Sequence, residues 1–372
     1  MEWPVVAVLG AGNVGHAMAG HLALKGYDVR LFNRWEHELT AVREAGGIYL
    51  QQTVEGFGRP SLVTTSIEEA IRGADVILIT VPAFGHRYMS ESIALFVSSG
   101  QVVVFQPGTF GSALELTAIL RAHGKVGIVA AETESSLYSC RLVGPARVNV
   151  RAVKKAVELA ALPASETGRV LAMLNKPFDG GYVPAENVLQ VGLGNGNPVY
   201  HCGPSLVNFG RIERAEDWPF FEFVTESVTR LIDSVDRERL ALVHALGLKT
   251  MSFWEFLESA YGASDADYVL RVHRAYGRGR PSRAPKSPED RYLTEDIPFG
   301  LVPWSSLAKQ LQVPTPTIDA LIQVASVLYG RDFFKEGRTA ESLGLAGLTA
   351  TEIKARVTDG FAAETKSIEA SA

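Results

Sequence analysis

The segment from Val5 to Gly15 (VVAVLGAGNVG) places the strongest constraint on how this chain can fold. The unbroken apolar run predicts a strand that is covered on both faces, and the helical rhythm after Gly15 predicts a helix directly behind the glycines. This combination is typical of a dinucleotide-binding βαβ unit, in which the helix N-terminus holds a pyrophosphate. An ordinary strand-to-helix turn would not need three glycines at this spacing.

Each glycine of the turn has its own expected task. Gly10 permits the tight turn, Gly12 lets the backbone approach the phosphates, and Gly15 lets the helix pack closely on the strand. The residues predicted to bind the cofactor at this turn are Gly10, Gly12, Asn13, Val14 and Gly15.

The end of the second predicted strand, 28–33, bears on the choice of cofactor. A fold specific for NAD usually places Asp or Glu here, about 20 residues past the glycines, to bind the ribose 2′-hydroxyl. This chain has Asn33 and then Arg34. A neutral amide and a guanidinium suit a 2′-phosphate, so NADP(H) is favoured and NAD(H) stays open. In the alternative, Arg34 is solvated and Glu36 or Glu38 reaches the ribose.

Strands and helices continue to alternate through the first half of the chain. Further strands are expected at 75–81, 101–105 and 127–131, and helices at 66–71, 87–96 and 113–120. The pattern predicts an α/β Rossmann domain with a doubly wound, mostly parallel sheet, whose ligands lie at the carboxyl ends of the strands. The loops at 82–85, which contains Pro82 and Ala83, and at 106–109 are therefore expected to border the nicotinamide. In the alternative, they are ordinary loops in which proline and glycine end the neighbouring strands and have no role in binding.

The pattern changes near residue 186. Apolar residues then recur every three or four positions, as in Phe223–Leu246, which predicts amphipathic helices and an all-α C-terminal domain. We expect a dinucleotide-binding domain at 1–185 and a helical catalytic domain at 186–372. The basic, proline-rich segment 277–290 is expected to be a surface loop, with a lid over the cofactor phosphates as the alternative.

Composition limits the partners of this chain. Its 372 residues carry a net charge of −5, so no general attraction to nucleic acid or anionic lipid is expected, and small molecules are the predicted ligands. Cys140 and Cys202 are too few for a disulfide framework. No apolar run reaches the roughly 18 residues of a membrane span, and the start of the chain lacks signal-peptide features, so a cytoplasmic location is expected.

Eight histidines are candidates for the proton donor that a reductase of C=O or C=N bonds needs. His201 stands out because Asn195 and Asn197 precede it, and a helix would place Asn197 and His201 on one face. His86, after the strand predicted at 75–81, is the second candidate. A catalytic imidazole also works best with a carboxylate that fixes its tautomer.

Several segments together resemble the opine dehydrogenases, the family that contains octopine and nopaline dehydrogenases, and most closely the bacterial enzymes that form N-(1-carboxyethyl) amino acids. The similarity spans nearly the whole chain. Its motifs are the glycine turn, 134–141 (ESSLYSCR), 197–201 (NPVYH), 291–296 (RYLTED) with 300–303 (GLVP), and 335–339 (KEGRT). In that family an Asn-x-x-x-His element and an Asp form the catalytic site, and they match Asn197, His201 and Asp296.

The resemblance implies reductive condensation, in which an amino acid or amine and a 2-keto acid such as pyruvate form an imine that NAD(P)H reduces to a secondary amine. His201 would be the acid/base, Asp296 would orient it, and Asn197 would bind the substrate carbonyl or carboxylate. Arg291 and Arg141 are the candidates for binding the substrate carboxylates. No metal is required, and a homodimer is expected.

Two other classes of function remain open alongside this one. A ketone or hydroxyacid reductase of the ketopantoate or 6-phosphogluconate type also has a Rossmann domain followed by helices, but it usually relies on a lysine. A non-catalytic dinucleotide-sensing protein could keep the same residues by descent. A Cys202 nucleophile assisted by His201 is disfavoured, because neighbouring residues in a helix point in different directions.

Overall fold

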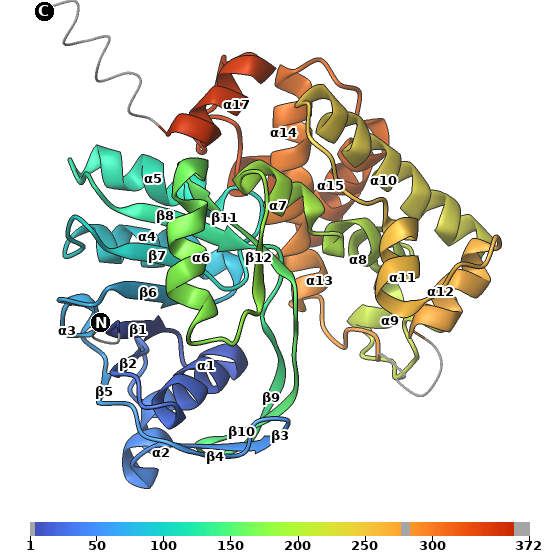
Figure 1. The fold of residues 1–372 in the computed structure, drawn as a ribbon. Helices are drawn as coiled ribbons and strands as arrows, with labels where there is room; N and C mark the ends of the chain where they lie inside the picture. The colour runs from blue at the N-terminus through green and yellow to red at the C-terminus, as the bar shows by residue number, and fades with distance from the viewer. Residues whose placement is uncertain (1–3, 277–282, 361–372) are drawn as a thin grey trace, which may run out of the picture. The chain divides into compact units, whose positions relative to one another are not determined.

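The computed structural model describes residues 4–276 and 283–360, and it contains two compact units (Figure 1). The first comprises Met1–Gly192 together with the chain from Ala355, and the second comprises Leu193–Lys354. Within the basic segment discussed above, 277–282 lie outside the described residues. No described helix combines the length and the apolar character that crossing a membrane requires.

The first unit is built on an eight-stranded sheet with the order β12-β11-β8-β7-β6-β1-β2-β5. All neighbours pair in parallel except β11 and β8. The doubly wound, mostly parallel sheet predicted from the sequence is therefore confirmed. The strands are β1 (Val6–Leu9), β2 (Val29–Phe32), β5 (Leu62–Thr64), β6 (Val76–Ile79), β7 (Val102–Phe105), β8 (Val129–Thr133), β11 (Val157–Leu162) and β12 (Tyr182–Pro184).

Helices and short helical turns connect these strands. The helices predicted at 66–71, 87–96 and 113–120 are present as α3, α4 and α5. The full set is α1 (Asn13–Leu24), α2 (His37–Ala45), α3 (Ile67–Ile71), η1 (Ala83–Gly85), α4 (His86–Ala94), α5 (Ser112–Ala122), η2 (Ala164–Glu166), α6 (Thr167–Asn175), α7 (Val188–Gly194) and α17 (Ala350–Asp359). The boundaries between the two units in the chain, after Gly192 and after Lys354, fall inside α7 and α17.

A second sheet, which the sequence analysis did not predict, packs against α1. It has the order β4 (Gly56–Gly58), β3 (Ile48–Gln52), β10 (Arg147–Val153) and β9 (Tyr138–Gly144). Helix α1 lies between the two sheets, as Figure 1 shows. The approach is close enough that a Cβ atom on Gly58 would lie 1.9 Å from the carbonyl oxygen of Gly20. Glycine and alanine along α1 make this packing feasible.

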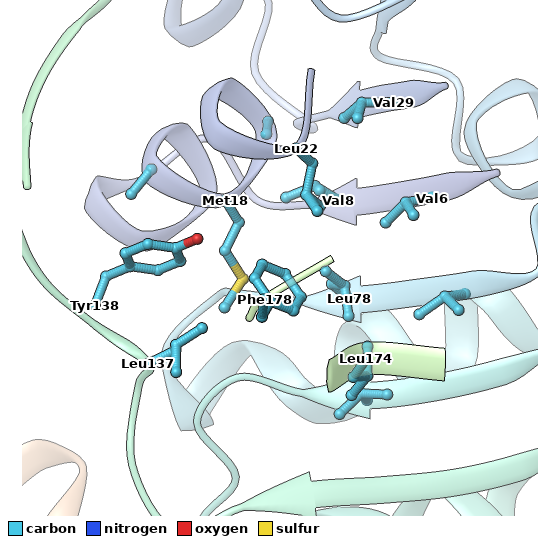
Figure 2. Close-up of a cluster of buried hydrophobic side chains, with 14 of the residues drawn as sticks. Val6, Val8, Met18, Leu22, Val29, Leu78, Leu137, Tyr138, Leu174 and Phe178 are labelled. Carbon is cyan, nitrogen blue, oxygen red and sulfur yellow. The ribbon is translucent and has the colours of Figure 1, made fainter. Parts of the chain in front are cut away.

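The core of the first unit fills the space around α1. Figure 2 shows Met18 and Leu22 from α1 among side chains of the strands, with Phe178 and Tyr138 closing the cluster. The hydroxyl of Tyr138 lies 2.7 Å from Nδ1 of His21. Burial, and then the charge of Lys25, lower the pKa of His21 to about 4, so this histidine is a neutral core residue.

The second unit is helical, as predicted. Its elements are α8 (Asn197–Leu206), α9 (Phe209–Glu213), η3 (Phe221–Phe223), α10 (Glu226–Ala245), α11 (Phe253–Tyr261), α12 (Tyr268–Tyr276), α13 (Arg291–Thr294), the π-helix η4 (Ile297–Leu301), α14 (Val302–Gln310), α15 (Pro316–Tyr329) and α16 (Phe333–Glu336). Glu238 of α10 accepts hydrogen bonds from the backbone N–H groups of Thr317 and Ile318, at 2.8 and 2.9 Å. Its carboxylate thus satisfies the otherwise unpaired donors at the start of α15.

A buried ion pair in α10 anchors the chain that leads into α8. Arg239 and Asp236 are both almost fully buried, and their closest atoms are 2.6 Å apart. Arg239 also donates to the carbonyl oxygens of Leu193 and Met251, at 2.5 and 2.8 Å. Asp236 accepts from the N–H of Phe253 at 2.7 Å. The pair therefore joins three segments of the second unit.

We predict that Arg239→Met lowers the free energy of unfolding by about 3–5 kcal/mol, because it leaves Asp236 buried without its partner. Urea unfolding monitored by tryptophan fluorescence measures this change. The matched control is Arg237→Met, since Arg237 pairs with Asp233 on the surface of the same helix. That control should change stability by less than about 1 kcal/mol. Equal effects of the two variants would contradict the anchoring role of Arg239.

Candidate functional site

The glycine turn between β1 and α1 has the geometry that a pyrophosphate needs. Gly10 has a φ of 117°, which L side chains rarely adopt, and a Cβ atom on Gly15 would lie 1.7 Å from the carbonyl oxygen of Gly10. A Cβ atom on Gly12 would meet no protein atom within 4 Å, so that side of the turn is open to a ligand. These residues fit the diphosphate of a dinucleotide at the N-terminus of α1.

Asn13 and Val14, the other two residues predicted to bind the cofactor at this turn, contact other parts of the first unit. The Oδ1 atom of Asn13 accepts a hydrogen bond from the N–H of Leu142 at 2.8 Å, and the thiol of Cys140 donates to the Asn13 carbonyl at 3.3 Å. Both contacts tie the start of α1 to β9. Val14 is partly buried and packs on the core. Val14 can therefore offer a ligand only its backbone, and Asn13 its backbone and the N–H groups of its amide.

Beside the carboxyl end of β2 lie both a cation that could bind a 2′-phosphate and a carboxylate that could bind the ribose hydroxyl, the two alternatives for the choice of cofactor. Asn33 is buried, and its amide donates a hydrogen bond to the carboxylate of Glu38. Arg34 is exposed, and its guanidinium carbon lies 4.6 Å from the ring centre of Trp35 and 5.2 Å from that of Tyr88. A positive group and a carboxylate thus flank the expected position of the ribose.

The loops after β6 and β7 show what His86 does. Pro82 precedes the turn η1, and Ala83 is buried within it. The ring nitrogens of His86 lie 3.0 Å from Oγ of Ser112 and 3.1 Å from the carbonyl oxygen of Val81. With both nitrogens engaged inside the first unit, His86 joins two loops and is poorly placed to transfer a proton.

Glu134, which follows β8, is a titratable residue to which the sequence pattern assigned no chemical role. Burial, and then the charge of Glu158, raise the pKa of Glu134 to about 7. This carboxyl can therefore gain or lose a proton near neutral pH. Its position three residues after the strand predicted at 127–131 was the available signal, but the neighbouring Glu158 is 24 residues away in sequence.

The three residues predicted to be catalytic, Asn197, His201 and Asp296, all belong to the second unit and come from two of its elements. Asn197 and His201 lie on the first turns of α8, and Asp296 directly precedes the π-helix η4. The Nδ1 atom of His201 and the Oδ2 atom of Asp296 are 2.7 Å apart, and both side chains are buried. Such a contact fixes the imidazole tautomer and leaves Nε2 for proton transfer.

Two close contacts hold this pair in place. The ring of Tyr292 stacks on that of His201, with centroids 3.6 Å apart and planes inclined by 10°. A Cβ atom on Gly300 would lie 2.4 Å from Cγ of Pro198, so only glycine allows η4 to approach the start of α8 this closely. π-helical turns are frequent at functional sites.

The remaining candidates of the second unit are placed differently. Cys202 is fully buried, its thiol points toward the carbonyl oxygen of Tyr292 at 3.7 Å, and burial raises its pKa. It therefore stays a protonated thiol rather than a nucleophile. The side chain of Arg291 is 60% exposed and lies 3.9 Å from the carboxylate of Glu295. Arg141 is exposed on β9 and belongs to the first unit.

Within residues 4–276 and 283–360, His, Cys, Asp and Glu side chains do not gather in groups that could hold a metal ion.

The glycine turn at the end of a parallel strand, followed by a helical unit with a buried His–Asp pair, defines an NAD(P)-dependent oxidoreductase.

Comparisons with known proteins narrow this class. Residues 184–329 match the family model of the NAD/NADP octopine/nopaline dehydrogenase alpha-helical domain, and residues 6–163 match that of ketopantoate reductase PanE/ApbA. An opine dehydrogenase of Arthrobacter sp. (strain 1C) is 39% identical over 96% of this chain and 99% of its own. Protein ocs of Agrobacterium tumefaciens (strain Ach5) is 30% identical over 94% and 97%. The chain belongs to the opine dehydrogenase family, oxidoreductases that act on CH–NH bonds.

Solved structures agree at the level of the fold. An octopine dehydrogenase with NADH and L-arginine superposes with a TM-score of 0.81 at 20% identity, over 96% of this chain and 98% of the other. A yersinopine dehydrogenase with NADP⁺ gives a TM-score of 0.76 at 17% identity, over 97% and 99%. The family model and the curated relatives confirm the resemblance inferred from the sequence motifs, and they support an NAD(P)H-dependent reductive condensation of an amino acid with a keto acid.

We predict that Gly300→Ala lowers kcat at least about tenfold, because the added methyl group pushes Pro198 away and moves Asp296 relative to His201. Steady-state kinetics and thermal unfolding measure the effect. The control is Gly210→Ala, since a Cβ atom on Gly210 of α9 would meet nothing within 4 Å. A Gly300→Ala variant with unchanged kcat would show that the close approach of η4 and α8 does not set the pair's geometry.

Proposed function

We propose that this enzyme condenses the amino group of an amino acid or simple amine with a 2-keto acid such as pyruvate, and that His201, Asp296 and Asn197 carry the reaction. The observation that supports this assignment is the buried contact of 2.7 Å between His201 Nδ1 and Asp296 Oδ2. Nε2 of His201 makes no hydrogen bond with any described residue and is left for the substrate.

His201 supplies the proton that the condensation needs. The amine adds to the keto carbon, and a proton moves from nitrogen to oxygen to give a carbinolamine. Protonated His201 then gives a proton to the departing hydroxyl, so that water leaves and a protonated imine forms. A bound nicotinamide cofactor would supply hydride to the carbon of this imine, which would give the neutral secondary amine. His201 regains its proton from solution, and Asp296 stabilises the imidazolium.

Asn197 and two arginines bind the substrates in this proposal. Asn197 lies one helical turn before His201, so its amide can hydrogen-bond the carbonyl or carboxylate of the keto acid. Arg291 and Arg141 are proposed to bind carboxylates, because a guanidinium pairs with a carboxylate through two parallel hydrogen bonds. The exposure of both side chains leaves them accessible to a ligand. A homodimer remains a prediction.

The cofactor preference proposed for this chain is NADP(H). Asn33 replaces the usual acceptor at the end of β2, and Arg34 is held by the faces of Trp35 and Tyr88. A 2′-phosphate would gain the Arg34 cation there, while the nearby carboxylate of Glu38 accepts a hydrogen bond from the amide of Asn33. Among the related structures, one contains NADH and another NADP⁺, so the family accommodates both.

The decisive assay follows NADPH and NADH oxidation with pyruvate, in the presence and absence of L-amino acids and simple amines. We expect oxidation that requires both the keto acid and the amine, with a secondary amine detected by mass spectrometry. Oxidation with the keto acid alone would instead identify a ketone reductase, an outcome to which the PanE/ApbA match of residues 6–163 gives weight. Cofactor binding without turnover would indicate a sensing protein.

His201→Ala tests the catalytic assignment in the same assay. We predict a loss of kcat of at least about a hundredfold, because general acid–base catalysis typically contributes 10²–10⁴-fold. The dissociation constant for the cofactor should stay within about twofold, since the glycine turn belongs to the other unit. Loss of cofactor binding together with activity would make His201 a structural residue.

Arg34→Ala tests the cofactor preference. We expect the KM for NADPH to rise at least about tenfold while the KM for NADH changes less than about threefold, because only NADPH carries the 2′-phosphate. The control is Arg72→Ala, an exposed arginine of the same unit that pairs with Glu68. Equal changes for the two cofactors would mean that Arg34 contacts the shared adenosine and would contradict phosphate recognition.

A further inference from the structure

A tyrosine next to the catalytic histidine is directed at Asn197. The hydroxyl of Tyr200 donates a hydrogen bond to Oδ1 of Asn197 at a distance of 2.8 Å. Both residues lie in α8, three positions apart, so the contact closes within one turn of the helix. No chemical role was assigned to Tyr200 from the sequence.

Aromatic side chains of three other elements fix the ring of Tyr200. It stacks on Phe253 of α11 at 5.0 Å and on Tyr276 of α12 at 5.8 Å, and it packs at a tilt on Phe221 of η3 at 6.1 Å. Its edge meets His201 at 4.5 Å. Because neighbours from α11, α12 and η3 hold the ring, the position of its hydroxyl is set by packing and not by the hydrogen bond itself.

The hydroxyl of Tyr200 can only act as a neutral donor toward Asn197. Burial, and then the neighbouring Tyr292, raise the pKa of Tyr200 above its usual value. The phenol therefore keeps its proton over the pH range in which enzymes of this class work. Its proton is directed at the amide oxygen, which is the one acceptor of the Asn197 side chain.

This contact decides which end of the amide faces a ligand. With Oδ1 engaged by Tyr200, the two N–H bonds of Nδ2 point the other way, and they find no hydrogen-bond partner among the described residues. The Nδ2 end of the amide, which is turned away from Tyr200, can donate to an oxygen, but it has no lone pair with which to accept a bond from an ammonium group.

We propose that Tyr200 is a positioning residue that locks the amide of Asn197 with its N–H groups toward the substrate, and thereby selects the keto acid oxygen over the amine as the partner of Asn197. The proposal rests on the substrate-binding role proposed above for Asn197. It adds a direction to that role: Asn197 recognises the acceptor substrate, while the amine must be recognised elsewhere.

The test removes only the hydroxyl. Tyr200→Phe retains the stacked ring, so the melting temperature and the dissociation constant for NADPH should be unchanged. With a fixed, saturating amine, kcat/KM for pyruvate should fall about tenfold, the usual cost of losing one hydrogen bond of this kind. The KM for the amine, measured at saturating pyruvate, should change by less than about twofold. Tyr261→Phe is the matched control, because Tyr261 packs on Tyr276 in the same cluster.

A double-mutant cycle with Asn197→Ala separates positioning from general structural support. If Tyr200 acts through Asn197, then adding Tyr200→Phe to Asn197→Ala should lower kcat/KM no further. Additive losses, or a loss that falls on the amine KM, would overturn the proposal. An inactive wild-type protein would instead mean that the proposed function is wrong, so the two failures are distinguishable. A melting temperature lowered in Tyr200→Phe but not in Tyr261→Phe would show a structural role and would also overturn it.

Discussion

The buried contact between His201 and Asp296 is the interaction on which the chemistry proposed for this protein depends. The two residues are 95 positions apart, and the fold brings them within hydrogen-bond distance inside a single unit. Their position requires Gly300, whose lack of a side chain lets η4 approach Pro198, and Tyr292, whose ring covers one face of the imidazole. Burial of the pair keeps water from competing for the hydrogen bond, which strengthens it.

The first unit also contains a helix that must approach its neighbours closely, and here the neighbours are two sheets. Helix α1 is covered by two sheets, and small residues such as Gly20 let it approach both. The same helix presents its N-terminus at the glycine turn, where a dinucleotide would bind. In both units, therefore, a helix start that is proposed to bind a ligand lies at a glycine contact that leaves no room for a side chain.

Much of this architecture could be predicted from local sequence, because continuous apolar runs mark the strands β1, β6 and β7, which are covered on both faces. The second sheet could not. Strand β3 alternates buried and exposed residues such as Leu50 and Tyr49, and it pairs in parallel with β10, which is distant in the chain. Half-exposed strands that depend on remote partners carry a weak local signal.

Some features of the candidate site could likewise be predicted from local sequence, and others could not. Local pattern identified the glycine turn and drew attention to His201, whereas only likeness to a family linked His201 to Asp296. The engagement of both nitrogens of His86, by Ser112 and Val81, was invisible in the sequence because it depends on two loops meeting. For the same reason Tyr200 gave no signal: its effect on Asn197 depends on rings that α11, α12 and η3 supply.

The tie between Asn13 and β9 has a consequence for how this protein can vary. The side chain of Asn13 and the thiol of Cys140 join the end of α1 beside the glycine turn to a strand 127 residues further along the chain, and Arg141 lies on that strand. A change in the backbone of β9 therefore alters the cofactor turn, even though no residue of β9 belongs to the glycine motif. If Arg141 binds a substrate as proposed, substitutions on β9 that change this binding will also change cofactor affinity, and the two properties are expected to evolve together.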